Sequence, residues 1–325
     1  MEGDAMDVLT KVQIDQTLQN VRSPLPSVSI EEAEAEHGMP WKSSIDPKLT
    51  AEQMMYMPFW EWQMEFMKDN LNNLHVVPST NEKGDTNFSF NQNAKKKARI
   101  VNMQLASDEY RKIRMTYYDA GENTQVFNSV WYPNPAYNLP VLGIDLLSFN
   151  GKKYLAIVDF QPLHDKEDDH AANFEHLLQP IKEQYDSLKG RMSSKFYDET
   201  QFFSQQMLFA RFEDGKVVEQ DLLPAFQDYV KTHLNLLKTT EPQTSTEDMK
   251  QVMDRQQAYD TYSAERDPAT GLFQAMFGAE WAGDFVYDFL FSLSERAPGQ
   301  MPTIPVMGPP PGAAGGKRPA QGQRP

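Results

Sequence analysis

The fold is decided by residues 124–160, which read TQVFNSVWYPNPAYNLPVLGIDLLSFNGKKYLAIVDF. The stretch contains three short runs of β-branched and aromatic residues, a composition typical of β-strands. Asn150-Gly151 separates the last two runs, and this dipeptide is a strong hairpin signal because both residues tolerate a positive φ. Strands joined by so short a turn must be antiparallel. We therefore predict an antiparallel meander at the centre of the chain.

Two further runs of this character precede the stretch, at 98–105 (ARIVNMQL) and 110–119 (YRKIRMTYYD). Elsewhere the apolar residues recur at helical spacing. The expected helices cover about 50–74, 171–189, 199–212, 221–240, 246–264 and 268–294. A meander followed by helices predicts an α/β protein in which helices cover a mainly antiparallel sheet on one or both faces.

The chain of 325 residues is long enough for one large folded domain, which we expect over 49–296. Residues 1–48, with several prolines and the acidic run EEAEAE, are expected to be loosely structured. Residues 297–325 are rich in Pro and Gly, which predicts a disordered tail. In the first expected helix, Pro58 predicts a break or kink near the start.

The composition excludes several kinds of chemistry. The chain has no Cys, which rules out disulfides and Cys-bound iron–sulfur clusters, so electrons for any redox reaction must come from outside. A net charge of −15 argues against nucleic acid as a partner. No apolar run is long enough to span a membrane, which predicts a soluble protein without a membrane partner. The acidic start MEGDAMDVL resembles no targeting peptide, so such a segment is either missing or already removed.

Motifs for a bound cofactor or metal are also missing. No GxGxxG follows a strand, and GAAGGKRP in the tail only imitates a phosphate loop, since Arg318 stands where Ser or Thr would coordinate magnesium. The loop 164–170 (HDKEDDH) contains two histidines and several carboxylates, but its pattern is typical of a solvated acidic loop. We expect no bound metal.

Asp145 is the residue that physical reasoning singles out. In the strand VLGIDLL it shares a face with Val141, Gly143 and Leu147, and both faces of this strand are apolar. A carboxylate in such a place is costly to bury, so it binds a proton, pairs with partners or takes part in chemistry. Function is the favoured interpretation, and a hydrogen-bonded structural role is the alternative. Asp159, near the end of the next strand, is expected to be structural.

Asp267 has two competing interpretations. It precedes Pro268 at the expected start of the last helix, where Asp is a good N-cap and Pro is a good first residue. A capping hydrogen bond lowers the pKa of a carboxyl group, which makes it a poorer proton donor. On local grounds the capping interpretation is the stronger.

Two long segments resemble one known family. QVFNSVWYPNPAYNLPVLGIDLLSF, followed by LAIVDFQPL, is similar to the central sheet of the ferredoxin-dependent bilin reductases. YDTYSAERDPATGLFQAMFGAEWAGDFVYDFLF resembles the C-terminal helices of that family. Within the family, the motifs YSAERDP and DAGENTQVFNSV are most similar to the sequences of the branch that makes 15,16-dihydrobiliverdin from biliverdin IXα. The similarity covers about 110–291 and implies a three-layer α/β/α sandwich, with the bilin between the sheet and the C-terminal helices.

The resemblance also implies roles for residues. The family's two acidic residues fall on Asp145 and Asp267, which would be a proton donor and a second donor or relay. Asn128 would hold pyrrole and lactam groups by hydrogen bonds. Arg266 is predicted to pair with a propionate, with an ordinary exposed position as an equal alternative. No cofactor would be bound, because reduced ferredoxin would deliver single electrons in sequence to the bilin.

The expected reaction is a two-electron reduction of biliverdin IXα at the 15,16 methine bridge. The phycocyanobilin-forming branch has His where this chain has Asn128 and Glu where it has Thr116, so that reaction is disfavoured. A reductase making phycoerythrobilin or phycourobilin and a non-catalytic bilin carrier remain as alternatives. Possible partners are ferredoxin and the next bilin reductase of phycobilin biosynthesis. The expected location is the plastid stroma of an alga, or the cytoplasm of a cyanobacterium.

Basic clusters are the candidates for docking an acidic ferredoxin. One consists of 95–97 (KKK) with Arg99, and the other of Lys152 and Lys153 beside the Asn-Gly hairpin. An ordinary solvated surface is the alternative for either cluster alone.

Overall fold

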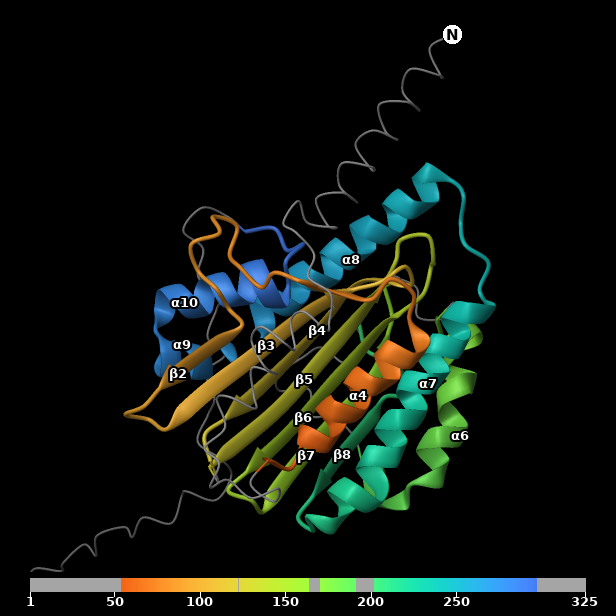
Figure 1. Ribbon diagram of the computed structural model, residues 1–325. Coiled ribbons are helices and arrows are strands. Elements are labelled where there is room, and N and C mark those ends of the chain that lie inside the picture. The colour runs from red at the N-terminus through yellow and green to blue at the C-terminus, as the bar shows by residue number, and fades with distance from the viewer. Residues whose placement is uncertain (1–53, 122, 164–169, 191–201, 297–325) are drawn as a thin grey trace, which may run out of the picture.

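The computed structural model describes residues 54–121, 123–163, 170–190 and 202–296. Within these ranges eight strands form one sheet, in the order β1-β3-β4-β5-β6-β7-β8, with β2 also pairing with β3 (Figure 1). Every strand pair is antiparallel, which confirms the predicted mainly antiparallel sheet. The strands are β1 (His75–Val77), β2 (Phe90–Asn93), β3 (Ala98–Ala106), β4 (Tyr110–Asp119), β5 (Thr124–Pro133), β6 (Val141–Phe149), β7 (Lys153–Gln161) and β8 (Leu208–Phe212).

Helices cover both faces of the sheet, so the fold is the predicted three-layer α/β/α sandwich (Figure 1). On one face lie α4 (Met57–Asn70), α6 (His176–Gln184) and α7 (Leu223–Thr239), with short helical segments at Ala171–Glu175, Asp186–Leu188 and Val218–Leu222. On the other face lie α8 (Thr246–Arg266), α9 (Thr270–Phe277), α10 (Ala279–Asp284) and the π-helical segment Phe285–Leu290.

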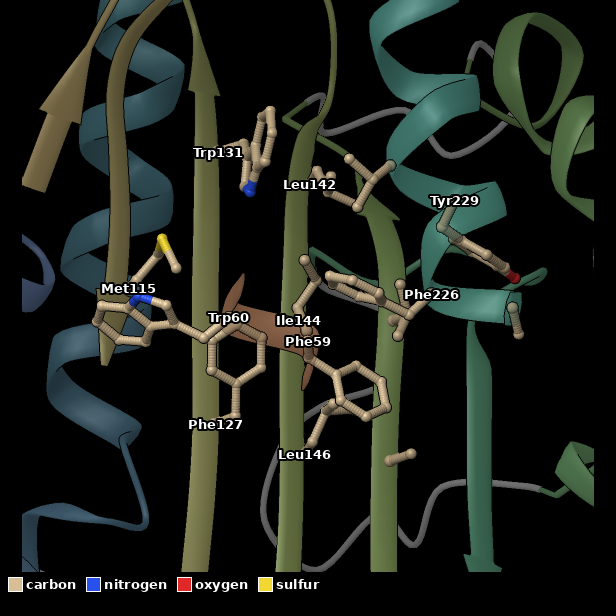
Figure 2. Close-up of a cluster of buried hydrophobic side chains, with 14 of the residues drawn as sticks. Phe59, Trp60, Met115, Phe127, Trp131, Leu142, Ile144, Leu146, Phe226 and Tyr229 are labelled. Carbon is tan, nitrogen blue, oxygen red and sulfur yellow. The ribbon is translucent and has the colours of Figure 1, made fainter. Parts of the chain in front are cut away.

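The α4 face of the sheet holds a densely aromatic core (Figure 2). Phe59 of α4 lies 5.2 Å from Phe226 of α7, and Trp60 lies 6.2 Å from Phe127 of β5, measured between ring centroids. All four side chains are fully or almost fully buried. The break predicted near Pro58 is present in the described residues, since 54–56 lie outside the helix and α4 begins only at Met57. Pro58 occupies the first turn, where its missing N–H costs no hydrogen bond.

A second core lies between the sheet and the C-terminal helices. Trp281, Phe285 and Phe289 stack in succession along the last helical segments, with ring centroids 4.7 and 5.3 Å apart. The single helix predicted over 268–294 is interrupted at Gly278, whose φ of +97° is accessible to glycine and strained for other residues. The chain therefore bends between α9 and α10 while keeping its aromatic face buried.

The helix predicted over 199–212 is wrong where the structure describes this range. Residues 208–212 form β8, which pairs with β7 at the edge of the sheet. A short apolar run such as LFARF fits a strand as well as a helix, and pairing with β7 satisfies its backbone. The strands β1 and β2 were not predicted either, since they contain only three and four residues.

The predicted Asn-Gly hairpin is present between β6 and β7. Asn150 and Gly151 have φ values of +54° and +57°, as a type I′ turn requires. The predicted N-terminal segment 1–48, the tail 297–325 and residues 164–169 of the HDKEDDH loop lie outside the described residues. No helix in the described ranges combines the length and apolar character that a membrane crossing requires.

Candidate active site

Asp145 lies at the centre of the sheet, on the face that is covered by α8–α10. Its register partner on β5 is Asn128, and the partner of Asn128 on β4 is Thr116. The three side chains share the face of Val130 and Val141, which belong to the core under the C-terminal helices. The predicted positions Asp145 and Asn128 are thus adjacent, because the register of the antiparallel pair β5 and β6 sets them directly opposite each other.

A hydrogen-bonded chain of side chains connects three neighbouring strands at this place. Arg114 Nη1 of β4 donates to Asn128 Oδ1 at 2.5 Å. Asn128 Nδ2 in turn donates to Asp145 Oδ1 at 3.1 Å. Arg114 was missed in the sequence, although its alternation with Lys112 and Thr116 in the strand YRKIRMTYYD was a signal that polar residues share one face.

Burial raises the pKa of Asp145 from its ordinary 3.8 to about 7. The hydrogen bond from Asn128 lowers this pKa, the charge of Asp267 raises it, and the charge of Arg114 lowers it, but burial outweighs the other causes. Asp145 therefore exists in both protonation states near neutral pH. Its side chain is nevertheless partly accessible. A carboxyl group with these properties can donate and recover a proton.

Asp267 approaches the same place from the helical layer. It ends α8, and its Oδ1 accepts the N–H of Ala269 at 2.8 Å. The predicted N-cap of a helix starting at Pro268 needs correction, because α9 begins only at Thr270 and the side chain of Asp267 instead closes the turn before it.

The hydrogen bond from Ala269 lowers the pKa of Asp267, as expected of a capping bond, but the net change is upward. Burial raises this pKa, while the N–H of Ala269 and the charge of Arg114 lower it less. Arg114 thus acts on both carboxyl groups, and Asp267 acts on Asp145. The structure brings the sheet acid, the helix acid and one guanidinium into a single electrostatic site.

Arg266 lies apart from this group. Its side chain is exposed, pairs with Glu265 at 2.9 Å and lies over the ring of Tyr262 at 4.3 Å. The described contacts of Arg266 include none with Asp145, Asn128 or Asp267. Its role toward a propionate stays a prediction.

Thr116 and Asp159 have different environments on the same face. The hydroxyl of Thr116 is buried and has no hydrogen-bond partner among the described residues. Asp159 is fully buried and accepts two hydrogen bonds from Ser204, from the backbone N–H at 2.8 Å and from Oγ at 2.5 Å. Asp159 thereby fastens the segment around Ser204 to the sheet, which is a structural role.

The described residues contain no group of three or more His, Cys, Asp or Glu side chains arranged to hold a metal ion. His170 is the only residue of the HDKEDDH loop within the described ranges, and its imidazole is buried against Phe174, with ring centroids 5.2 Å apart.

The basic clusters lie at one end of the sheet. Residues 95–97 form the turn between β2 and β3, and Lys152 and Lys153 lie at the turn between β6 and β7. The antiparallel order places both turns at the same end, and all five lysines are exposed. Arg99 differs from them, since it pairs with Asp119 at 2.6 Å.

Comparison with known proteins decides the family. The model of the ferredoxin-dependent bilin reductases matches residues 69–292, which include the whole candidate site. The chain belongs to this family. As a bilin reductase, the protein is an oxidoreductase that takes its electrons from ferredoxin.

Two similar relatives are both named 15,16-dihydrobiliverdin:ferredoxin oxidoreductase. The bilin reductase from Nostoc punctiforme is 40% identical and that from Gloeobacter violaceus 38% identical, each over 237 residues. Each alignment covers 73% of this chain and 95% of the relative. Phytochromobilin synthase from tomato, solved in complex with biliverdin, shares the fold with a TM-score of 0.64 and 22% identity, over 74% of this chain and 86% of the tomato protein.

Proposed function

We propose that this bilin reductase converts biliverdin IXα into 15,16-dihydrobiliverdin. In the balanced reaction, two electrons and two protons are added across the double bond between C15 and C16, which becomes a single bond. Two reduced ferredoxins supply the electrons one at a time and are oxidised. The names of the cyanobacterial relatives support this reaction.

The observation that carries the proposal is the pair of carboxyl groups with raised pKa values in one electrostatic site. Asp145 comes from the sheet and Asp267 from the helical layer. A conjugated tetrapyrrole that has accepted an electron is a much stronger base, so a nearby neutral carboxyl group can protonate it. Two donors from opposite layers suit a reaction that consumes two protons, with solvent restoring each carboxyl group afterwards.

The neighbours of Asp145 support reduction at the bridge rather than at a vinyl group. In the resemblance stated above, the phycocyanobilin-forming branch carries His and Glu at the positions of Asn128 and Thr116. Neither an amide nor a hydroxyl can donate a proton as readily as those groups. The acids that remain on this part of the sheet face are therefore Asp145 and its helical partner Asp267.

The experiment is anaerobic turnover of biliverdin with reduced ferredoxin, followed by chromatography of the product. We expect 15,16-dihydrobiliverdin, with both vinyl groups retained, and an absorption shift to shorter wavelength as the conjugation shortens. A main product of phycocyanobilin, phycoerythrobilin or phycourobilin would contradict the proposed bond. Biliverdin binding without oxidation of ferredoxin would indicate a carrier instead.

We further infer that ferredoxin docks at the end of the sheet that carries the lysine turns. The protein has a net charge of −15, and an acidic partner would be repelled from most of such a surface. The exposed lysines 95–97, 152 and 153 form a local exception at one end of the sheet. The compartment is the plastid stroma if the organism is an alga and the cytoplasm if it is a cyanobacterium. A second bilin reductase of the same pathway would receive the product.

A further inference from the structure

We propose that Arg114 is a positioning residue, which fixes the Asn128 amide so that Asp145 accepts a hydrogen bond at Oδ1 and carries its transferable proton on Oδ2. This inference deepens the proposed function and rests on it for the role of Asp145 as a proton donor. The geometry of the three side chains carries the inference.

The first step is the direction of the hydrogen bonds. A guanidinium group can only donate, so the atom of Asn128 that faces Arg114 must be the carbonyl oxygen. The amide nitrogen of Asn128 then faces Asp145 and can only donate to it. Without Arg114, the amide could rotate by 180° and offer its oxygen to Asp145 instead.

The second step is the consequence for the proton. With Oδ1 of Asp145 engaged as an acceptor, the proton of the neutral carboxyl group resides on Oδ2, the oxygen that Asn128 does not occupy. In the rotated arrangement the amide oxygen would accept the carboxyl proton and hold it. That bond stabilises the neutral form of Asp145 and makes it a weaker acid.

The environment of Arg114 indicates that its burial serves more than packing. Arg114 is 2% exposed and lies 5.1 Å from the ring of Phe291. Within the described ranges its Nε has no hydrogen-bond partner, although burying a cation is costly unless its donors are satisfied. Its charge instead acts on the two carboxyl groups, lowering the pKa of Asp145 and of Asp267.

Other ionisable groups near the site do not compete with this effect. Tyr259 of α8 and Tyr56, which precedes α4, are coupled electrostatically to Arg114 and to Asp145, respectively. Burial raises the pKa of both phenols far above neutrality, so both stay uncharged. Asp267 and Arg114 are thus the charged neighbours that act on Asp145.

Lys112 supplies a matched control on the same strand and the same face. Its Nζ is also buried, but it donates to the carbonyl of Phe289 and to Ser292, which fastens the C-terminal helical segment to the sheet. Lys112 does not act on the pKa of Asp145 or Asp267. Burial lowers the pKa of Lys112 well below its usual range, and the charge of Arg114 lowers it further. Replacing Lys112 removes a buried basic group and its two hydrogen bonds, and it removes no hydrogen bond of the proposed chain.

The test is the titration of Asp145 in the protein without bilin or ferredoxin, by NMR of ¹³C-labelled aspartate carboxyls assigned with Asp145→Asn. We expect Arg114→Met to raise the midpoint by about one pH unit or more, because it removes both the charge and the donor. Arg114→Lys, which keeps the charge and one donor, should restore much of the shift. Lys112→Met should leave the midpoint within about 0.3 units.

Unchanged titration in Arg114→Met would overturn the proposal, and so would an equal shift in Lys112→Met. If Arg114→Met does not fold, Arg114→Lys and Asn128→Leu provide the comparison. With Leu at position 128 the amide is gone, so the residual shift that Arg114→Lys causes beside Asn128 should disappear, whereas an equal shift in both backgrounds would contradict the relay. The titration needs no substrate, so it separates failure of this inference from failure of the proposed reaction.

Discussion

The two faces of β6 show how one strand serves two purposes. Leu142, Ile144 and Leu146 point toward α4 and α7 and are at most 1% exposed. On the opposite face, Asp145 and Leu147 remain partly accessible beneath the C-terminal helices. One face is filled with apolar side chains. The other carries Asp145, whose pKa of about 7 leaves the carboxyl group partly protonated near neutral pH.

The difference separates stability from chemistry. Apolar burial on the α4 face stabilises the sandwich, at roughly 25 cal/mol for each Å² removed from water. On the α8 face, a buried guanidinium and two carboxyl groups with raised pKa values reduce the stability of the fold. Proteins commonly lose stability in this way at functional sites. Substitutions on the α8 face should therefore reduce turnover without reducing stability, and substitutions on the α4 face should reduce stability without reducing turnover.

The largest expected effect is on turnover, from Asp145→Asn. An amide cannot donate the proton, so product formation should fall by about 10²- to 10⁴-fold, while biliverdin still binds and accepts an electron. Anaerobic single-turnover spectra should show a radical that decays without product. Product formation within twofold of the wild-type rate would remove Asp145 as a donor.

The same variant should be more stable than the wild type above neutral pH. The native pKa of Asp145 is raised from 3.8 to about 7, so its contribution to stability is present below 3.8 and is lost as the pH rises through 7. Asn has no such loss. The melting temperature should therefore decrease less between pH 5 and pH 8 in Asp145→Asn than in the wild type.

On the α4 face the expectation reverses. Phe59→Ala should lower the free energy of unfolding by about 3–5 kcal/mol, because it leaves a cavity beside Phe127 and Phe226. Turnover per folded molecule should stay near the wild-type value well below the melting temperature. Glu61→Ala, at an exposed position of the same helix, is the matched control and should change stability by less than about 0.5 kcal/mol. A turnover defect in folded Phe59→Ala would contradict the claim that the α4 face contributes to stability alone.

Asp267→Asn should have a smaller effect on turnover than Asp145→Asn, and almost none on stability at acid pH. Asn can accept the N–H of Ala269 as Asp267 does, so at pH values where Asp267 is protonated in both states the free energy of unfolding should change by only a few tenths of a kcal/mol. At higher pH the variant should be the more stable protein, because burial raises the pKa of Asp267 and Asn has no charge to bury. Loss of the carboxyl group should slow product formation by at least about tenfold if Asp267 donates or relays the second proton. Melting curves and anaerobic turnover measure the two effects. A near-normal rate would mean that the role of Asp267 is limited to closing the turn before α9.

Local signals in the sequence predicted the features that depend on neighbouring residues. The hairpin at Asn150-Gly151 follows from backbone preference, and Asp145 is conspicuous as the acid in an apolar strand. Asn128 and the proposed catalytic role of Asp267 entered through the family resemblance, whereas local signals had marked Asp267 only as a helix cap. The sandwich followed from a meander flanked by helices together with the same resemblance.

The features that sequence reasoning missed depend on contacts between distant residues. Arg114 joins the site only because the register of β4 and β5 places it diagonally across from Asn128, whose direct partner is Thr116, and register is not visible in one strand. The strand β8 exists because β7 offers an edge to pair with, which a short apolar run cannot reveal. The break at Gly278 likewise required knowing how the aromatic face packs.

The smallest expected effect concerns the lysine turns, which belong to neither face and lie between β2 and β3 and between β6 and β7. Reversing the charges of Lys95 and Lys97 should slow turnover about three- to tenfold at low ionic strength, since an acidic ferredoxin would be repelled from the end of the sheet. The turnover rate should also depend less on salt concentration, because there is no longer an attraction between ferredoxin and the lysine turn for salt to screen. Biliverdin affinity should not change.

The matched control reverses two exposed lysines of α7, Lys231 and Lys238, in the layer over the opposite face. It makes the same change in net charge, so it isolates the location of the charges from their number. Stopped-flow oxidation of ferredoxin at increasing salt concentrations would measure both variants. Equal slowing in the two would mean that ferredoxin responds to the net charge of −15 rather than to a docking end. Slowing confined to Lys95 and Lys97 would place electron entry at the turn between β2 and β3, on the same sheet that positions Asp145.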